Sequence, residues 1–112
     1  MKLVQYLSLV LLTLLLLLPS SSLAQSQANT GSIEGIITDQ TGAVVPNAEV
    51  TLQNTGTNFT RRLTTDSEGR FRGVLMPLGQ YRVTVKSPNF NTLVREGLSL
   101  GVGQALNLAL TL

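Results

Sequence analysis

Apolar and polar residues alternate in short runs along most of the chain after residue 31. The clearest run is residues 81–86, in which the inward-facing set is Tyr81, Val83 and Val85 and the outward-facing set is Arg82, Thr84 and Lys86. A period of two is typical of a β-strand that buries one face and leaves the other in water. After residue 24, no window has apolar residues at helical spacing over three turns. The pattern therefore predicts strands and no amphipathic helix.

Turn-forming residues separate these runs about every 8 to 12 positions, which is the spacing of an all-β sandwich or barrel. The third predicted strand is rich in threonine and arginine and is expected at a sheet edge. Seven strands in so short a chain favour two packed sheets. The predicted strands are residues 32–38, 48–53, 60–65, the run around Phe71, 81–86, 92–100 and the leucine run 106–112.

The first 24 residues have a different pattern. Lys2 precedes an apolar run over residues 3–18, and small residues precede Gln25. This order predicts a secretory signal peptide at residues 1–24, cleaved before Gln25. The run is short for a bilayer span, so a retained membrane anchor is the less favoured alternative. We expect residues 25–31 to form a flexible leader and the mature protein to be periplasmic, outer-membrane-associated or secreted, with no membrane span.

Composition argues against catalysis. The chain has no histidine and no cysteine, so the usual general base, thiol nucleophile and thiolate metal ligands are absent. Asp39 and Asp66 each stand three residues before a glycine, and we interpret them as turn residues rather than as half of a catalytic carboxylate pair. A calcium site on residues 66–69 would need further alternating oxygen ligands. We therefore predict no enzyme activity and no cofactor.

Charge offers one candidate binding feature. The formal net charge is +2, and few aromatic residues accompany it, so nucleic-acid binding is not expected. If the third and fourth strands pair as a hairpin, four arginines share a surface. That surface would dock an acidic protein or an anionic glycan of the cell envelope, and the alternative is an ordinary solvated strand face. The four candidate residues are Arg61, Arg62, Arg70 and Arg72.

The order of these features resembles the carboxypeptidase regulatory-like domain, a transthyretin-like and immunoglobulin-like β-sandwich. The resemblance covers residues 32–112, and the part at residues 97–104 looks like the copies at the amino terminus of bacterial TonB-dependent outer-membrane receptors. The other matching stretches are residues 35–39 followed by Gly42, 45–50, 65–71, 78–83 and the corner 88–90.

The resemblance implies a non-catalytic module, because in metallocarboxypeptidases this domain sits beside the catalytic one. It suggests an exported binding or spacer module, either free or as the amino-terminal part of a TonB-dependent receptor. The alternative is a carbohydrate-binding module of similar fold. The phase of Tyr81 with its neighbouring valines places that ring in the core rather than on a sugar.

Overall fold

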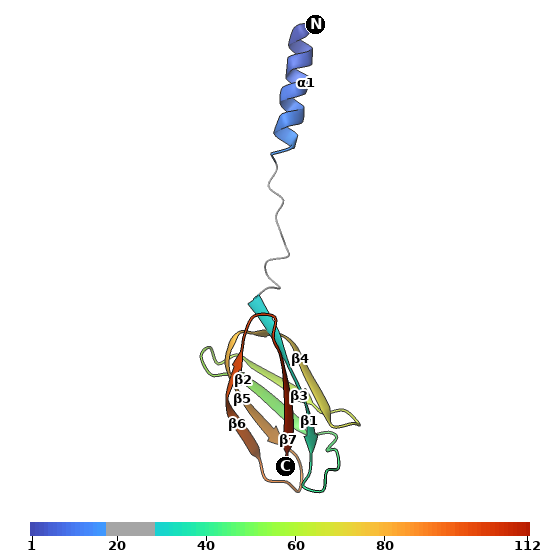
Figure 1. Cartoon of the computed structure of the whole chain (residues 1–112), viewed down its shortest axis with the longest axis vertical. Coiled ribbons are helices and arrows are strands. Elements are labelled where there is room, and N and C mark those ends of the chain that lie inside the picture. The colour runs from blue at the N-terminus through green and yellow to red at the C-terminus, as the bar shows by residue number, and fades with distance from the viewer. Residues whose placement is uncertain (18–28) are drawn as a thin grey trace.

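The computed structural model describes residues 1–17 and 29–112, and it contains one helix and seven strands (Figure 1). The predicted seven-stranded β-sandwich is confirmed. The helix is α1 (Lys2–Leu15), and the strands are β1 (Thr30–Thr38), β2 (Glu49–Asn54), β3 (Thr60–Thr64), β4 (Arg70–Pro77), β5 (Gly79–Lys86), β6 (Leu93–Leu100) and β7 (Ala105–Thr111).

Helix α1 lies within the segment predicted to be a signal peptide. Its leucine-rich sequence favours helix, and none of its residues is buried. Among residues 1–17 and 29–112, no helix is long and apolar enough to cross a membrane. The predicted cleavage before Gln25 and the leader up to residue 28 lie outside the described residues. The leader prediction is wrong at its end, because Thr30 and Gly31 already pair with β4 as the start of β1.

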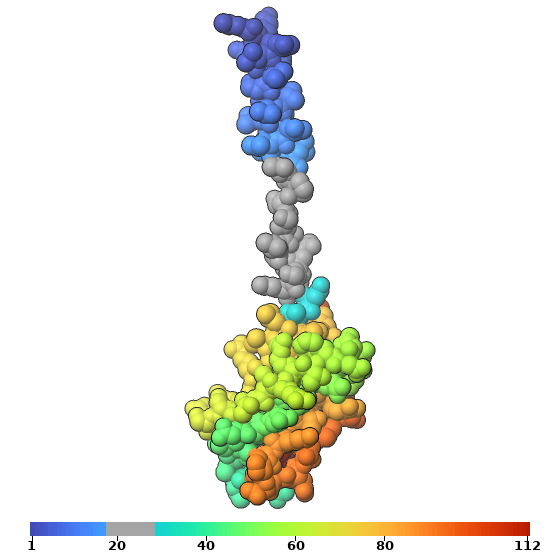
Figure 2. All heavy atoms as spheres, turned by 180° about the vertical axis from the view of Figure 1, so that it is seen from behind, coloured from blue at the N-terminus to red at the C-terminus, as the bar shows by residue number. Residues whose placement is uncertain are grey.

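The strands form two sheets, one of order β4-β1-β7 and one of order β3-β2-β5-β6. Strand β7 runs beside β1 in the same direction, whereas the other paired strands are antiparallel (Figure 1). Strand β3 is an edge strand, as its composition predicts. Figure 2 shows the outer face of the four-stranded sheet, where the green residues of β2 and β3 adjoin the orange residues of β5 and β6.

The core lies between the sheets and follows the alternation of the sequence. Tyr81, Val83 and Val85 of β5 are fully buried, and Phe71 of β4 is 4% exposed, so both predicted aromatic core positions are confirmed. Gly35 of β1 makes room for Phe71, because a Cβ atom on Gly35 would lie 2.8 Å from the Phe71 ring. Burying one large apolar side chain stabilises the fold by about 1.5 to 3 kcal/mol.

Two buried polar side chains tie the strands to loops that are distant in sequence. The Asn54 amide nitrogen donates to the Leu78 carbonyl at 3.0 Å, and its oxygen accepts from the Gly56 and Thr57 amides at 3.0 and 3.2 Å. The Asn54 side chain thus closes the turn that follows β2. Asn54 is 2% exposed, and its hydrogen bonds offset the cost of burying an amide.

Thr65 holds the connection between β1 and β2 in the same way. Its hydroxyl donates to the Val45 carbonyl and accepts from the Ala48 amide, both at 2.8 Å. The residue was predicted to end the third strand, but β3 ends at Thr64. Thr65 instead begins the segment that crosses from one sheet to the other. Because of this crossing, the arginines of β3 and those of β4 lie in different sheets.

Candidate functional site

The predicted hairpin between the third and fourth strands is wrong. Strand β3 pairs with β2, whereas β4 pairs with β1 in the other sheet. The residues between β3 and β4 cross from one sheet to the other instead of turning within one sheet. The four arginines therefore do not share a single surface.

Arg61 and Arg62 point to opposite sides of β3. Arg61 is paired with the buried Leu52, so its side chain faces inward at the side of the sandwich where β3 and β4 lie. Its guanidinium lies over the Phe59 ring, 5.4 Å from the centroid, and donates to the Val74 carbonyl of β4. Arg61 thus connects the two sheets, whereas the exposed Arg62 lies on the outer face of the four-stranded sheet.

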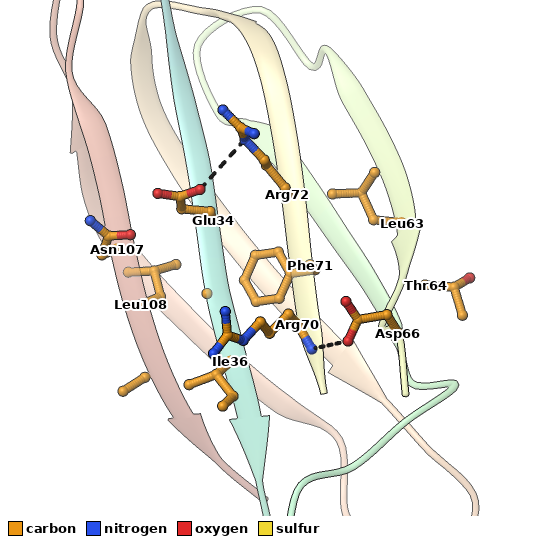
Figure 3. Close-up of a pocket in the computed structure, with 12 residues that line it drawn as sticks. Glu34, Ile36, Leu63, Thr64, Asp66, Arg70, Phe71, Arg72, Asn107 and Leu108 are labelled. Carbon is orange, nitrogen blue, oxygen red and sulfur yellow. Dashed lines mark hydrogen bonds and ion pairs between the residues drawn. The ribbon is translucent and has the colours of Figure 1, made fainter. Parts of the chain in front are cut away.

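Arg70 and Arg72 do share a face, the outer side of the β4-β1-β7 sheet. The Arg72 Nε atom lies 3.5 Å from Glu34 Oε2 on β1, and the two side chains point toward each other (Figure 3). The Arg70 Nε atom lies 3.6 Å from Glu68 Oε2. The arginine side chains are 70% and 66% exposed, so each ion pair contributes at most about 1 kcal/mol. Both guanidinium groups are accessible to a partner.

These two arginines border an open groove of about 840 Å³. Asn107 and Ala109 of β7 line it together with Ile36 of β1, so the groove combines charged, amide and apolar groups. Planar guanidinium groups bind carboxylate, sulfate or phosphate oxygens through paired hydrogen bonds. We call this surface the arginine groove and define it by Glu34, Ile36, Arg70, Arg72, Asn107 and Ala109.

The aspartates nearest the loops serve as turn residues, as predicted. Asp39 Oδ1 accepts hydrogen bonds from the Thr41 hydroxyl at 2.6 Å and the Thr41 amide at 2.8 Å. Asp66 Oδ1 accepts from the amides of Arg70 at 3.0 Å and Glu68 at 2.9 Å. These donors lower the pKa of both carboxyls below the usual 3.8. Each is therefore ionised at neutral pH and poorly suited to proton transfer.

This arrangement makes the folded state sensitive to acid. A carboxyl with a lowered folded pKa stabilises the fold above its unfolded pKa, near 3.8, and this stabilisation is lost as pH falls through the lower folded value. We expect the unfolding free energy to decrease between about pH 4 and pH 2. The Asp39→Asn, Asp66→Asn double variant keeps the accepting oxygens without titrating, so its profile should be flatter.

Urea unfolding measured across this pH range tests the prediction. Glu68→Gln is the control, because Glu68 is an exposed acid on the same turn as Asp66. A double variant as acid-sensitive as the native protein would show that other carboxylates dominate.

A second, smaller hollow lies at the end of the sandwich where the β1–β2 and β5–β6 connections meet. It measures about 360 Å³. Phe90 lines it and is 38% exposed, more than any other aromatic ring in residues 29–112. Residues 88–90 were predicted only as a corner, although a phenylalanine between two asparagines in a turn is a signal for an exposed ring. The polar neighbours of Phe90 in this hollow are Asp39, Gln40, Thr41, Asn89 and Asn91.

Neither surface gathers enough candidate ligands to hold a metal ion. Among residues 1–17 and 29–112, no group of three or more histidine, cysteine, aspartate or glutamate side chains is placed to hold a metal ion. Every buried side-chain nitrogen or oxygen in this part of the chain has a hydrogen-bond partner. The side chains that line the two surfaces supply guanidinium, carboxylate, amide and phenyl groups.

The fold and these surfaces define a small β-sandwich module of the immunoglobulin-like class. The sequence model of the carboxypeptidase regulatory-like domain matches residues 32–112. The chain belongs to this family, as the resemblance in its turns and strands predicts. No curated protein sequence matches the chain.

Solved structures with the same fold have different roles. A candidate carbohydrate-binding protein from Bacteroides uniformis is 20% identical, with a TM-score of 0.60 over 73% of this chain and 40% of its own. A candidate carbohydrate-binding protein from Pseudomonas aeruginosa is 19% identical, with a TM-score of 0.52 over 76% and 90%. Catechol 1,2-dioxygenase from Pseudomonas arvilla is 11% identical, with a TM-score of 0.60 over 75% and 52%. At these identities only the fold is shared.

Proposed function

We propose that this chain is a non-catalytic, exported module of the bacterial envelope that binds or spaces other envelope components. The observation that carries the proposal is the arginine groove, an accessible surface with two exposed guanidinium groups. The carboxylate of the neighbouring Asp66 accepts hydrogen bonds from backbone amides of its own turn. Family membership supports a regulatory or binding role. The resemblance of residues 97–104 to TonB-dependent receptors supports a place at the amino terminus of such a receptor.

The apolar residues of α1 and the small residues before Gln25 support export. Producing the full chain in a Gram-negative bacterium and determining the mass of the accumulated protein tests this. We expect the mature protein to begin at Gln25 and to be found outside the cytoplasm. A Leu11→Arg, Leu14→Arg control should remain cytoplasmic, because two charges interrupt the apolar run. A mature protein that retains Met1 would contradict export by cleavage.

The proposed partner is an acidic protein or anionic glycan of the envelope, bound at Arg70 and Arg72. We expect the Arg70→Glu, Arg72→Glu variant to capture less of this partner from envelope extract, with the larger loss at low salt. The control is Arg62→Glu, Lys86→Glu, which makes the same charge change with two exposed residues of the other sheet. Equal capture by both variants would show that the groove does not select the partner.

A second candidate function is carbohydrate binding at the Phe90 hollow. The exposed ring offers an apolar face to sugar C–H groups, and the nearby amides can pair with hydroxyls. The two candidate carbohydrate-binding proteins of the same fold support this reading. Nuclear magnetic resonance titration with neutral glucan oligosaccharides tests it. Phe90→Ala should abolish the shifts and Phe90→Leu should weaken them, whereas an unresponsive native protein would exclude these sugars as ligands.

A further inference from the structure

The four sheet edges differ in how well they are protected from pairing with another strand. An edge strand presents unpaired backbone donors and acceptors, and proteins block such edges with charges, prolines or bulges. Strand β3 carries Arg61 and Arg62. Strand β4 has a register shift near Leu75, whose φ is 52°, and it ends at Pro77. Strand β6 has a register shift opposite residues 81–83 and carries adjacent charges at its bulge.

Strand β7 has none of these protective features. Its sequence, ALNLALT, contains no charge, proline or glycine. It pairs with β1 in unbroken register over seven positions, from Ser32 opposite Ala105 to Thr38 opposite Thr111. Figure 1 shows it beside β1, as the edge strand of the three-stranded sheet. Among the described residues, no strand pairs with its other side.

The hydrogen bonds at the two ends of β7 show which residues face the free edge. The Ser32 amide donates to the Gln104 carbonyl at 2.9 Å, and the Leu112 amide donates to the Thr38 carbonyl at 2.8 Å. In a parallel pair, alternate residues of one strand direct both backbone groups to the same neighbour. The even-numbered residues therefore face β1. The residues that direct their N–H and C=O groups to the free edge are Ala105, Asn107, Ala109 and Thr111.

The inner side of this edge is apolar and incompletely covered. Leu106 and Leu108 of β7, and Leu93 and Leu98 of β6, pack against the core but remain half-buried. A strand added beside β7 would cover these side chains from the open side of the sandwich. Burial of apolar area would then add to the backbone hydrogen bonds.

We propose that β7 pairs with β7 of a second copy of this chain, antiparallel and centred on Leu108. This register sets Leu106 opposite Leu110 on the inner side and Asn107 opposite Ala109 on the outer side. It brings no charge against a like charge, whereas self-pairing of β3 would set arginines against each other. The two three-stranded sheets would become one continuous six-stranded sheet. The absence of charge along the whole edge favours an identical copy over a charged partner.

Sedimentation velocity of the exported protein over a wide concentration range, from about 1 µM to 1 mM, tests the pairing. We expect a monomer–dimer equilibrium. The Asn107→Lys, Ala109→Lys variant places lysines opposite each other at both positions and should weaken dimerisation at least about tenfold. The control is Thr60→Lys, Gln80→Lys, two exposed positions of the other sheet that are not opposite each other, which changes the charge equally. It should dimerise like the native protein.

Cross-linking then tests the register. The chain has no cysteine, so Asn107→Cys and Ala109→Cys can be introduced separately. Their Cα atoms would lie about 5.5 Å apart in the proposed pair, within disulfide range. Mixing the two variants should give a cross-linked dimer, and each alone should give little. A native protein that is monomeric at every concentration, or lysine variants that dimerise equally, would overturn the pairing without affecting the proposed export and groove binding.

Discussion

Replacing Tyr81 with alanine is expected to lower the free energy of unfolding by about 3 to 5 kcal/mol, the usual cost of removing a buried aromatic ring. Tyr81 is fully buried between the sheets, and its hydroxyl donates to the Pro77 carbonyl. Phe71→Ala should have an effect of the same order, because that ring covers Gly35. Both losses come from a cavity that neighbouring side chains cannot refill.

Tyr81→Phe separates packing from hydrogen bonding. It keeps the ring and removes one hydrogen bond, so the expected loss is only about 1 kcal/mol. Burial raises the pKa of Tyr81 above 10, so its stabilising effect is present below pH 10 and is lost as pH rises through the folded value. Tyr81→Phe should therefore reduce the alkaline sensitivity. Urea unfolding followed by circular dichroism measures all three variants, and an alanine loss below half a kcal/mol would contradict a core position.

Strand positions and the core were accessible from sequence because they depend on local alternation. Residues 81–86 are the strongest example, and β5 spans Gly79–Lys86. The pairing between strands was harder to predict from sequence. The turn at residues 66–69 has the same local chemistry whether the chain turns within a sheet or crosses to the other sheet. The arginine prediction failed at that step, although each arginine was correctly placed on a strand.

Side chains whose roles depend on distant segments were also missed. Asn54 is buried because the Leu78 carbonyl, 24 positions along the chain, reaches it. Strand β4 likewise continues to Pro77, so that only Leu78 separates it from β5. The hollow at Phe90 also depends on a distant segment, because the loop containing Thr41 forms part of its wall. Composition alone does not specify these contacts.

The fold alone does not determine the arginine groove or the free edge of β7. The same sandwich occurs in candidate carbohydrate-binding proteins and in a dioxygenase, so function depends on the side chains that each sequence places on it. Here the arginine groove arises because β4 pairs with β1 and thereby sets Arg72 beside Glu34. The free edge arises because β7 joins the same sheet on its other side.

The two Asp-x-x-Gly turns provide a matched pair for the second large effect. Gly42 and Gly69 both have positive φ, 87° and 73°. A Cβ atom on Gly42 would meet nothing within 4 Å, whereas one on Gly69 would lie 2.7 Å from the Ile37 carbonyl oxygen. Alanine at either position costs about 1 to 2 kcal/mol for the left-handed conformation. At Gly69 the turn must also move away from β1, which adds about 1 to 3 kcal/mol.

We therefore expect Gly42→Ala to lower the free energy of unfolding by about 1 to 2 kcal/mol and Gly69→Ala by about 2 to 5 kcal/mol. Chemical denaturation of both variants in the same buffer measures the difference. Equal losses would mean that the residue 66–69 turn can shift without disturbing the hydrogen bond from the Ile37 amide to the Gly69 carbonyl, 2.8 Å long in this structure. A larger loss at Gly69 would show that this turn is held against β1 by close packing, in addition to its own hydrogen bonds.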